Sequence, residues 1–167
     1  TGYTTMAIAT ILQLKRDSAA DWTSNNPTLV AGRVGIEEDT GQFKIGDGTT
    51  AWTSLKYAGS TVPQNSKSAA YTTVMSDAGK HILHPSADTT ARIFTIDSNA
   101  NVAYPIGTAL TFVNQNSAGV ITISITSDTM RLAGAGTTGS RTLAANGIAT
   151  ALKITSTEWI ISGTGLT

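Results

Sequence analysis

The two histidines are the first residues to weigh for chemistry, because imidazole is the usual proton carrier near neutral pH and a common metal ligand. His81 and His84 lie in the run Lys80-His81-Ile82-Leu83-His84-Pro85. In a helix this spacing would place both on one face, where they could share a metal; in a strand it sends them to opposite faces. The apolar neighbours and Pro85 favour a strand, so we interpret both as structural or surface histidines and predict no metal and no cofactor.

The sequence motifs do not favour hydrolytic chemistry either. The Gly-x-Ser-x-Gly elbow of α/β-hydrolases is absent. Glycoside hydrolysis needs two carboxylates, and the acidic cluster Glu37-Glu38-Asp39 is explained by a solvated hairpin tip. Asp47-Gly48-Thr49-Thr50 resembles part of a calcium loop but lacks the alternating acidic ligands and the later Glu of an EF-hand. The tyrosines and arginines show no grouping of the kind that a polysaccharide lyase needs, so we predict no catalytic residue and no enzyme.

Composition narrows the class of partner. Eleven basic and eleven acidic residues cancel, so no net field steers the chain to nucleic acid or to an anionic membrane. No apolar run approaches the roughly 20 residues that span a bilayer, and no export signal is visible. Charged residues are 13% of the chain and cysteines are absent, which leaves a polar surface of Thr, Ser, Asn and Gly, suited to exposed β-sheet.

The stretch from Gly32 to Tyr57 is the most informative part of the chain. Two short β-type runs, Arg33–Glu37 and Gln42–Ile45, are joined through Asp39-Thr40-Gly41, which is a hairpin signal. The Gly46-Asp47-Gly48 turn repeats the device one strand later, so we expect a tight meander. Upstream, Asp17 to Trp22 predicts a short helix with Asp17 or Ser18 as its N-cap.

These motifs, together with the run Leu12–Asp17, resemble the N-terminal module of tailed-phage tail-fibre and receptor-binding proteins, of the major-tropism-determinant-like and hyaluronidase-like kinds. The resemblance covers about the first third of the chain. It implies a three-fold trimer with a β-prism-like base.

The rest of the chain reads as short strands at roughly ten-residue spacing, which favours an antiparallel β-sandwich or a jelly-roll-like barrel. Asn114–Gly119 is a natural hairpin loop, and Gly134-Ala135-Gly136, Asn146-Gly147 and Ser156-Thr157 are further turns. The predicted strands are Arg92–Ile96, Ala109–Asn114, Val120–Ile125, Met130–Leu132, Arg141–Leu143, Ile148–Ile154 and Glu158–Ser162.

This second region resembles a C-terminal module of phage virion proteins, through Tyr104–Thr108, Leu110–Asn114, Gly119–Ile123 and the final Glu158–Gly163 strand. The predicted fold class is therefore all-β. Its parts are an N-terminal assembly base at 1–60, a linker at 61–70 and a C-terminal sandwich head at 71–167.

Residues 1–60 contain few large apolar groups, and a domain of about 60 residues is marginal by itself. Neighbouring copies would supply the missing burial and close the free sheet edges. Together with the three-fold assembly that the resemblance implies, this predicts a homotrimer; the alternative is a monomer with a single poorly packed domain. The candidate residues for the trimer contact are Leu12, Leu14, Trp22, Phe43, Trp52 and Tyr57.

Recognition is expected on the polar loops at the ends of the sandwich. Trp159 lies mid-strand and is predicted to be core, whereas Tyr104 is expected to be exposed. The candidate receptor contacts, with a host surface glycan or protein, are Tyr104, Asn114, Asn116, Thr137 and Thr138.

Two functions fit these expectations. The first is a structural protein on the exterior of a tailed-phage virion, made in the bacterial cytoplasm, that attaches to the host as a tail fibre or tail-tip protein bound to other virion proteins. The alternative is a capsid decoration or head-fibre protein that stabilises the shell, which the shortness of the chain favours. A hyaluronidase-like polysaccharide depolymerase is a distant third.

Overall fold

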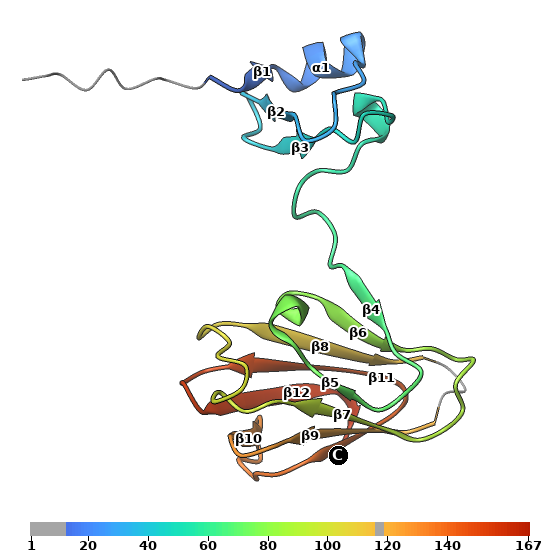
Figure 1. The fold of residues 1–167 in the computed structure, drawn as a ribbon, viewed down its shortest axis with the longest axis vertical. Helices are drawn as coiled ribbons and strands as arrows, with labels where there is room; N and C mark the ends of the chain where they lie inside the picture. The colour runs from blue at the N-terminus through green and yellow to red at the C-terminus, as the bar shows by residue number, and fades with distance from the viewer. Residues whose placement is uncertain (1–12, 116–118) are drawn as a thin grey trace, which may run out of the picture. The chain divides into compact units, whose positions relative to one another are not determined.

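The structure is a computed structural model that describes residues 13–115 and 119–167. It divides into two compact units, Thr1–Thr61 and Val62–Thr167 (Figure 1). Strands dominate the C-terminal unit, whereas the N-terminal unit combines three short strands with α1, Ala19–Asn25, the one α-helix among the described residues. The predicted β-rich character is therefore confirmed. No helix in the described part of the chain has the length and apolar character needed to cross a membrane.

A three-stranded sheet forms the N-terminal unit, with β1 (Lys15–Asp17), β2 (Val34–Glu37) and β3 (Phe43–Ile45) in the order β1-β2-β3. β2 and β3 make the predicted antiparallel hairpin, whose turn contains Gly41 at a φ of 69°. The predicted meander is wrong in its third strand, because that strand is β1, parallel to β2. A turn motif shows that the chain reverses, but not which edge receives the next strand.

Helix α1 and the 3-10 turn η1, Trp52–Ser54, carry the two buried tryptophans of this unit. Ser18 is the N-cap of α1, as predicted, and its hydroxyl accepts a hydrogen bond from the Asp21 amide at 3.1 Å. Asn26 ends the helix in a left-handed conformation with φ 40°. Its side-chain oxygen accepts a hydrogen bond from the Thr53 amide at 2.9 Å, which joins the helix end to η1.

The C-terminal unit is built on one mixed sheet of nine strands. A second 3-10 turn, η2 (Met75–Asp77), lies between β5 and β6. The strands are β4 (Gln64–Ser66), β5 (Tyr71–Thr72), β6 (His81–His84), β7 (Arg92–Ile96), β8 (Ala109–Asn114), β9 (Ile121–Ile125), β10 (Thr129–Leu132), β11 (Arg141–Lys153) and β12 (Glu158–Leu166).

Successive strands of this sheet alternate between two wings. β4, β6 and β8 pair in parallel in one wing, and β5, β7 and β9 pair in parallel in the other. Arg92 pairs with Ile121 and Thr129 with Glu158, in each case 29 residues farther along the chain. The chain thus crosses from wing to wing and returns beside itself after 17 residues between β4 and β6, 23 between β5 and β7, and about 30 in the later pairs.

β11 joins the two wings and corrects the predicted topology. Its start pairs antiparallel with β9 and its end with β8, with a register shift between Leu143 and Ile148. Asn146, at φ 63°, lies in this irregular stretch, so the Asn146-Gly147 motif marks a bulge within one strand and not a turn between two. The predicted β8–β9 hairpin and the all-antiparallel sheet are wrong, because loop residues do not reveal whether the strands they join are partners.

The wings enclose the main core of the molecule. Alternate residues of β6 to β9 point inward, among them Phe94, Phe112 and Ile123, each with no exposed surface. Trp159 of β12 is fully buried, as predicted. The core continues onto β10 and β11 through Met130 and the Leu143, Ala149 and Ala151 side chains.

A hydrogen-bonded polar cluster lies at the start of the C-terminal unit. The predicted linker, residues 61–70, includes β4, which pairs with β6. Asn65 of β4 donates to Asp77 at 2.7 Å, and the Tyr71 hydroxyl donates to the same carboxylate at 2.7 Å. Asp77 is only 1% exposed, so these bonds fix β4 and β5 against η2.

Candidate functional site

Two stacked tryptophans form the centre of the N-terminal unit. Trp22 and Trp52 lie with ring centroids 4.1 Å apart at 15° and are 2% and 1% exposed. The Trp22 indole donates to the Ile36 carbonyl at 2.8 Å. A Cβ on Gly35 would lie 2.7 Å from Trp52 Cζ3 and 3.0 Å from Trp22 Cη2. The glycine in the middle of β2 is therefore required by the indole pair above it.

Lys44 is a buried cation in the same core, and the sequence patterns did not reveal it. Its side chain is 4% exposed, and Nζ donates to the Trp52 carbonyl at 2.8 Å. The ammonium lies 4.2 Å from the Tyr57 ring centroid and 4.7 Å from that of Trp52. Cation–π contact and one hydrogen bond thus hold β3 against η1.

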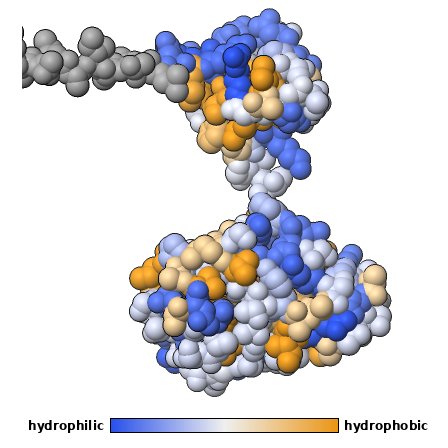
Figure 2. Space-filling view, viewed as in Figure 1, coloured by the Kyte–Doolittle hydropathy of each residue, from blue (hydrophilic) through white to orange (hydrophobic). Residues whose placement is uncertain are grey.

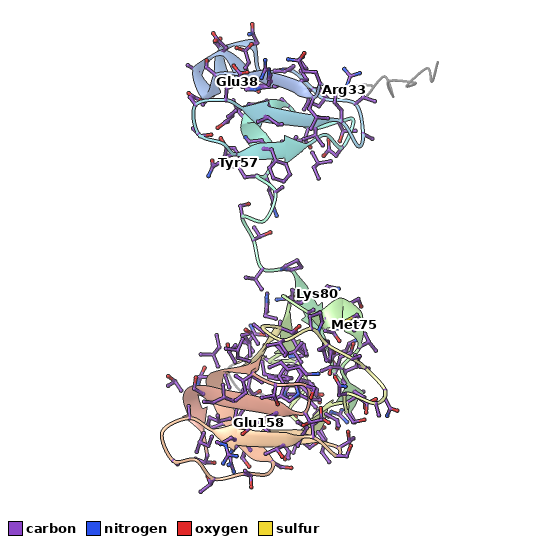
Figure 3. The ribbon with its side chains drawn as sticks, turned by 90° about the vertical axis from the view of Figure 1, so that its left-hand side faces the viewer. Arg33, Glu38, Tyr57, Met75, Lys80 and Glu158 are labelled. Carbon is purple, nitrogen blue, oxygen red and sulfur yellow. The ribbon has the colours of Figure 1, made fainter. Side chains whose placement is uncertain are left out.

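Glu37 is also buried, which corrects part of the predicted solvated tip. It is 1% exposed and accepts hydrogen bonds from the Tyr57 hydroxyl and from Thr40 Oγ1, each at 2.6 Å. The bond to the Glu37 carboxylate raises the pKa of Tyr57 (labelled in Figure 3). Glu38, by contrast, pairs with Arg16 at 2.8 Å on the surface. Glu37 is thus a buried hydrogen-bond acceptor that ties β2 to Tyr57 and to its own turn.

Turn chemistry accounts for the Asp47 motif. The Asp47 carboxylate accepts hydrogen bonds from the Thr49 amide at 2.9 Å, the Thr50 amide at 2.7 Å and the Thr50 hydroxyl at 2.5 Å. These bonds hold the pKa of Asp47 well below its usual range. Its oxygens are engaged by the loop itself, as the turn interpretation expects.

The opposite face of the three-stranded sheet is apolar and has no covering element among the described residues of this unit. Pairing sets Val34 beside Ile45 and Ile36 beside Phe43. Phe43 is 42% exposed and Ile45 48%, while α1 and η1 lie on the other face of the sheet. Leu14, just before β1, is 40% exposed and continues the alternation of β1.

We call Leu14, Val34, Ile36, Phe43 and Ile45 the apolar outer face. Arg16, paired with Ile36, adds a charged edge to it. A depression of about 560 Å³ lies beside this face, and Leu14 and Val34 help to line it. Figure 2 shows hydrophobic residues gathered on one side of this unit. Contiguous exposed apolar surface of this kind is typical of an interaction site.

The predicted trimer contacts fall into two groups in the described structure. Leu14 and Phe43 lie on the apolar outer face, whereas Trp22 and Trp52 are buried within the unit. Tyr57 is half-buried against Lys44 and Glu37. Leu12 lies outside the described residues. The burial of the two tryptophans makes them supports of the face and not parts of it.

A family comparison identifies this unit. Residues 12–50 match the family model of the major tropism determinant N-terminal domain. The N-terminal unit carries the signature of that domain. The match includes Trp22, Gly35, Glu37 and Lys44 of the core described above and the whole apolar outer face, whereas Trp52 and Tyr57 lie after it. The resemblance that the motifs predicted for the N-terminal unit is thus confirmed.

A phage protein is similar to part of the chain. A hyaluronoglucosaminidase of Streptococcus pyogenes phage H4489A is 44% identical over 46 residues, which are 28% of this chain and 12% of that protein. No solved structure matches the chain. The resemblance of the C-terminal unit to a phage virion module stays a prediction.

Two of the predicted receptor contacts in the C-terminal unit are buried. Tyr104 is 3% exposed, packs edge-on against Trp159 and donates its hydroxyl proton to the Val74 carbonyl at 2.7 Å. Asn114 is 1% exposed. The prediction that Tyr104 is exposed is therefore wrong, because the residue before Pro105 turns inward and not outward. Asn116 lies outside the described residues.

His84 and its neighbours form a buried polar cluster. The Asn114 amide donates to the carbonyls of Gly119 at 2.9 Å and Leu143 at 3.0 Å, which turns its oxygen toward His84 Nδ1 at 3.0 Å. His84 Nε2 lies 3.1 Å from Asp88. Both ring nitrogens lie within hydrogen-bond distance of side-chain oxygens, which fixes the orientation of the ring.

Asp88 in turn accepts two hydrogen bonds from Arg92, at 2.7 and 3.1 Å, which hold the pKa of Asp88 well below its usual range. Both histidines lie in strand β6, as predicted. His84 is buried in this cluster, whereas His81 is partly exposed and contacts Gln64. Within residues 13–115 and 119–167, no group of three acidic, histidine or cysteine side chains could hold a metal ion.

Thr137 and Thr138 are exposed, on a loop that two arginines hold. Arg131 donates to the Gly136 carbonyl at 3.0 Å and pairs with Glu158 (labelled in Figure 3) at 2.7 Å. Arg141 donates to the carbonyl and the hydroxyl of Thr137. This is the one region where the predicted receptor residues lie on described, accessible surface.

Proposed function

We propose that this chain is a non-enzymatic structural protein on the exterior of a tailed-phage virion, and that it serves host attachment as part of a tail fibre or tail tip. The match of residues 12–50 to the major tropism determinant N-terminal domain is the observation that supports this most. The similarity to a protein of a Streptococcus phage supports the same source.

The proposal includes a homotrimer whose β-prism-like base is built from the apolar outer face. The described part of the N-terminal unit has a core of three large apolar residues, Trp22, Leu29 and Trp52. Phe43 and Ile45 stay nearly half exposed. A unit of about 60 residues is marginal in isolation. Copies that meet through this face would bury the apolar side chains that each copy leaves in water.

An enzymatic role has less support from the residues present. The hyaluronoglucosaminidase activity belongs to the named phage protein, of which this chain matches 12%. In the N-terminal unit, Glu37 is bonded to Tyr57 and Thr40, and Asp47 is bonded to its own turn. These carboxylates support the fold, so a structural function is the better proposal.

The test is to find the protein in the virion and to block adsorption with it. Cryo-electron microscopy of the particle is expected to place it on the tail, and purified protein is expected to slow adsorption of the phage to its host. Hundreds of copies on the capsid would replace the tail proposal with the decoration alternative. Degradation of host polysaccharide by the purified protein would overturn the non-enzymatic assignment.

A further inference from the structure

A small polar hollow lies at one end of the C-terminal unit, where β9 leads into β10 and the arginine-held loop folds beside them. Its volume is about 310 Å³, at the lower end of the roughly 300–1,000 Å³ typical of ligand pockets. Hydroxyl and carboxylate groups dominate its polar lining, which comes from Thr126, Asp128, Thr129, Thr138 and Ser140.

Most of these polar groups are not used by the protein. Among the described residues, the hydroxyls of Thr129, Thr138 and Ser140 make no side-chain hydrogen bond, although each can donate one and accept two. Asp128 uses one carboxylate oxygen to accept from the Asn99 amide at 3.0 Å. Its other oxygen has no described donor. Three hydroxyls and one carboxylate oxygen therefore converge on the hollow with free hydrogen-bonding capacity.

The loop that carries two of these hydroxyls is fixed before any ligand arrives. The Gly139 amide donates to the Met130 carbonyl at 3.1 Å, and Thr138 forms a bridge with Arg131. Arg141 donates to the Ser140 carbonyl at 3.2 Å as well as to Thr137. A site whose groups are already ordered loses less entropy when it binds, so even a small polar ligand can be held.

The chemistry of the lining selects the ligand. No lysine or arginine side chain lines the hollow, and Asp128 gives it a negative charge, so phosphates, sulfates and uronates are disfavoured. Hydroxyl groups that both donate and accept match a ligand with the same double capacity. We propose that the hollow is a binding site for a neutral saccharide, of one or two sugar rings, on the host surface.

This inference rests on the proposed host-attachment function, because it names the class of receptor. The first experiment exposes the full-length protein to an array that carries neutral saccharides (glucose, galactose, rhamnose and N-acetylglucosamine units) beside anionic ones (glucuronate, sialic acid and glycerol phosphate). Binding to at least one neutral saccharide and to none of the anionic ones is expected. Binding confined to anionic saccharides, or to none, would overturn the proposal.

Substitutions then locate the site. At nearly constant volume, Thr138→Val removes a hydroxyl, and Asp128→Asn replaces one acceptor oxygen with an amide NH2 that only donates. Each is expected to weaken the affinity for the best neutral saccharide about tenfold, which is about 1.4 kcal/mol. Thr164→Val is the matched control, because Thr164 is an exposed β12 residue outside the lining of the hollow. Equal affinities in all three variants and the wild type would place the binding elsewhere and sink the proposal.

Competition of phage adsorption separates the two levels of inference. If wild-type protein competes and the Thr138→Val and Asp128→Asn variants compete equally well, host attachment stands and the hollow is not its site. If wild-type protein does not compete at all, the attachment function fails, and the saccharide proposal that rests on it fails with it. Amide spectra of each variant confirm that the loop keeps its fold.

Discussion

The two units of this chain treat their apolar side chains in opposite ways. The N-terminal unit encloses two indoles and Leu29 and leaves a whole sheet face, centred on Phe43 and Ile45, in water. The C-terminal unit folds its sheet around fourteen buried apolar residues, and its exposed ones are spread over different strands and loops. The described residues of the first unit leave an apolar sheet face uncovered, whereas the second unit encloses its own apolar core.

The buried polar groups differ in the same sense. In the N-terminal unit Lys44 and Glu37 take core positions that an apolar residue would fill in a larger domain. In the C-terminal unit His84 and Asn114 are set between wings that already have an apolar core. Polar contacts are thus a main part of the first core and an addition to the second.

The largest expected effect comes from the indole pair. Trp52→Ala removes half of the stack, at a cost of about 3–5 kcal/mol, whereas a unit of this size holds roughly 3–9 kcal/mol in all. We expect the N-terminal unit to unfold while the C-terminal unit stays folded, as followed by amide NMR. The matched substitution Phe94→Ala in the larger core should destabilise its unit without unfolding it. A folded N-terminal unit in Trp52→Ala would contradict the contrast.

Sequence motifs predicted the local elements well where one side chain or turn decides them. Ser18 caps α1, the β2–β3 hairpin forms around Gly41, and the strands of the C-terminal unit lie close to the predicted runs. Each of these outcomes depends on neighbours within a few residues. Such signals are therefore readable without knowledge of the rest of the fold.

Long-range pairing could not be predicted in the same way. The parallel wings arise because β8 and β9 pair with different parts of β11, and no feature of the loop between them encodes that choice. The burial of Tyr104 depends on Trp159, which lies 55 positions later in the chain. Leu14, Phe43 and Thr138 are exposed, as their predicted roles require, and those roles stay predictions.

The buried Asn114 tests how much polar contacts contribute to the stability of the C-terminal unit. Asn114→Ala leaves the carbonyls of Gly119 and Leu143 and the His84 ring without their partner, and each unsatisfied buried group costs about 1–3 kcal/mol. The C-terminal unit is expected to lose about 2–4 kcal/mol, measured as a lower urea midpoint, with no change in the N-terminal unit. Thr142→Ala, an exposed β11 residue, is the control. Equal midpoints for Asn114→Ala and wild type would show that the cluster contributes little.

Self-association through the apolar outer face can be tested by sedimentation. Phe43→Ser with Ile45→Ser should leave the indole core folded but weaken self-association about 100-fold, because each side chain contributes about 1.5 kcal/mol on further burial. Wild type is expected to sediment at about three times its 17.2 kDa mass, and the double variant at one. Ile93→Ser, at a residue 53% exposed on β7, should leave the trimer intact. A single-copy wild type at micromolar concentration would refute the trimer.

The smallest expected effect is a loss of stability of the C-terminal unit at alkaline pH, caused by the buried Tyr104. Burial raises the pKa of Tyr104 to about 12, so its neutral hydroxyl stabilises the folded C-terminal unit below pH 10, and that contribution is lost as the pH rises from about 10 toward 12. The urea midpoint of this unit should therefore fall between pH 10 and 12. Tyr104→Phe keeps the ring against Trp159 but cannot ionise, so its midpoint starts lower, for want of the bond to Val74, and falls less steeply. Equal slopes for the two proteins would assign the alkaline loss to another group, of which Tyr71, with its pKa also raised by burial, is the first to test.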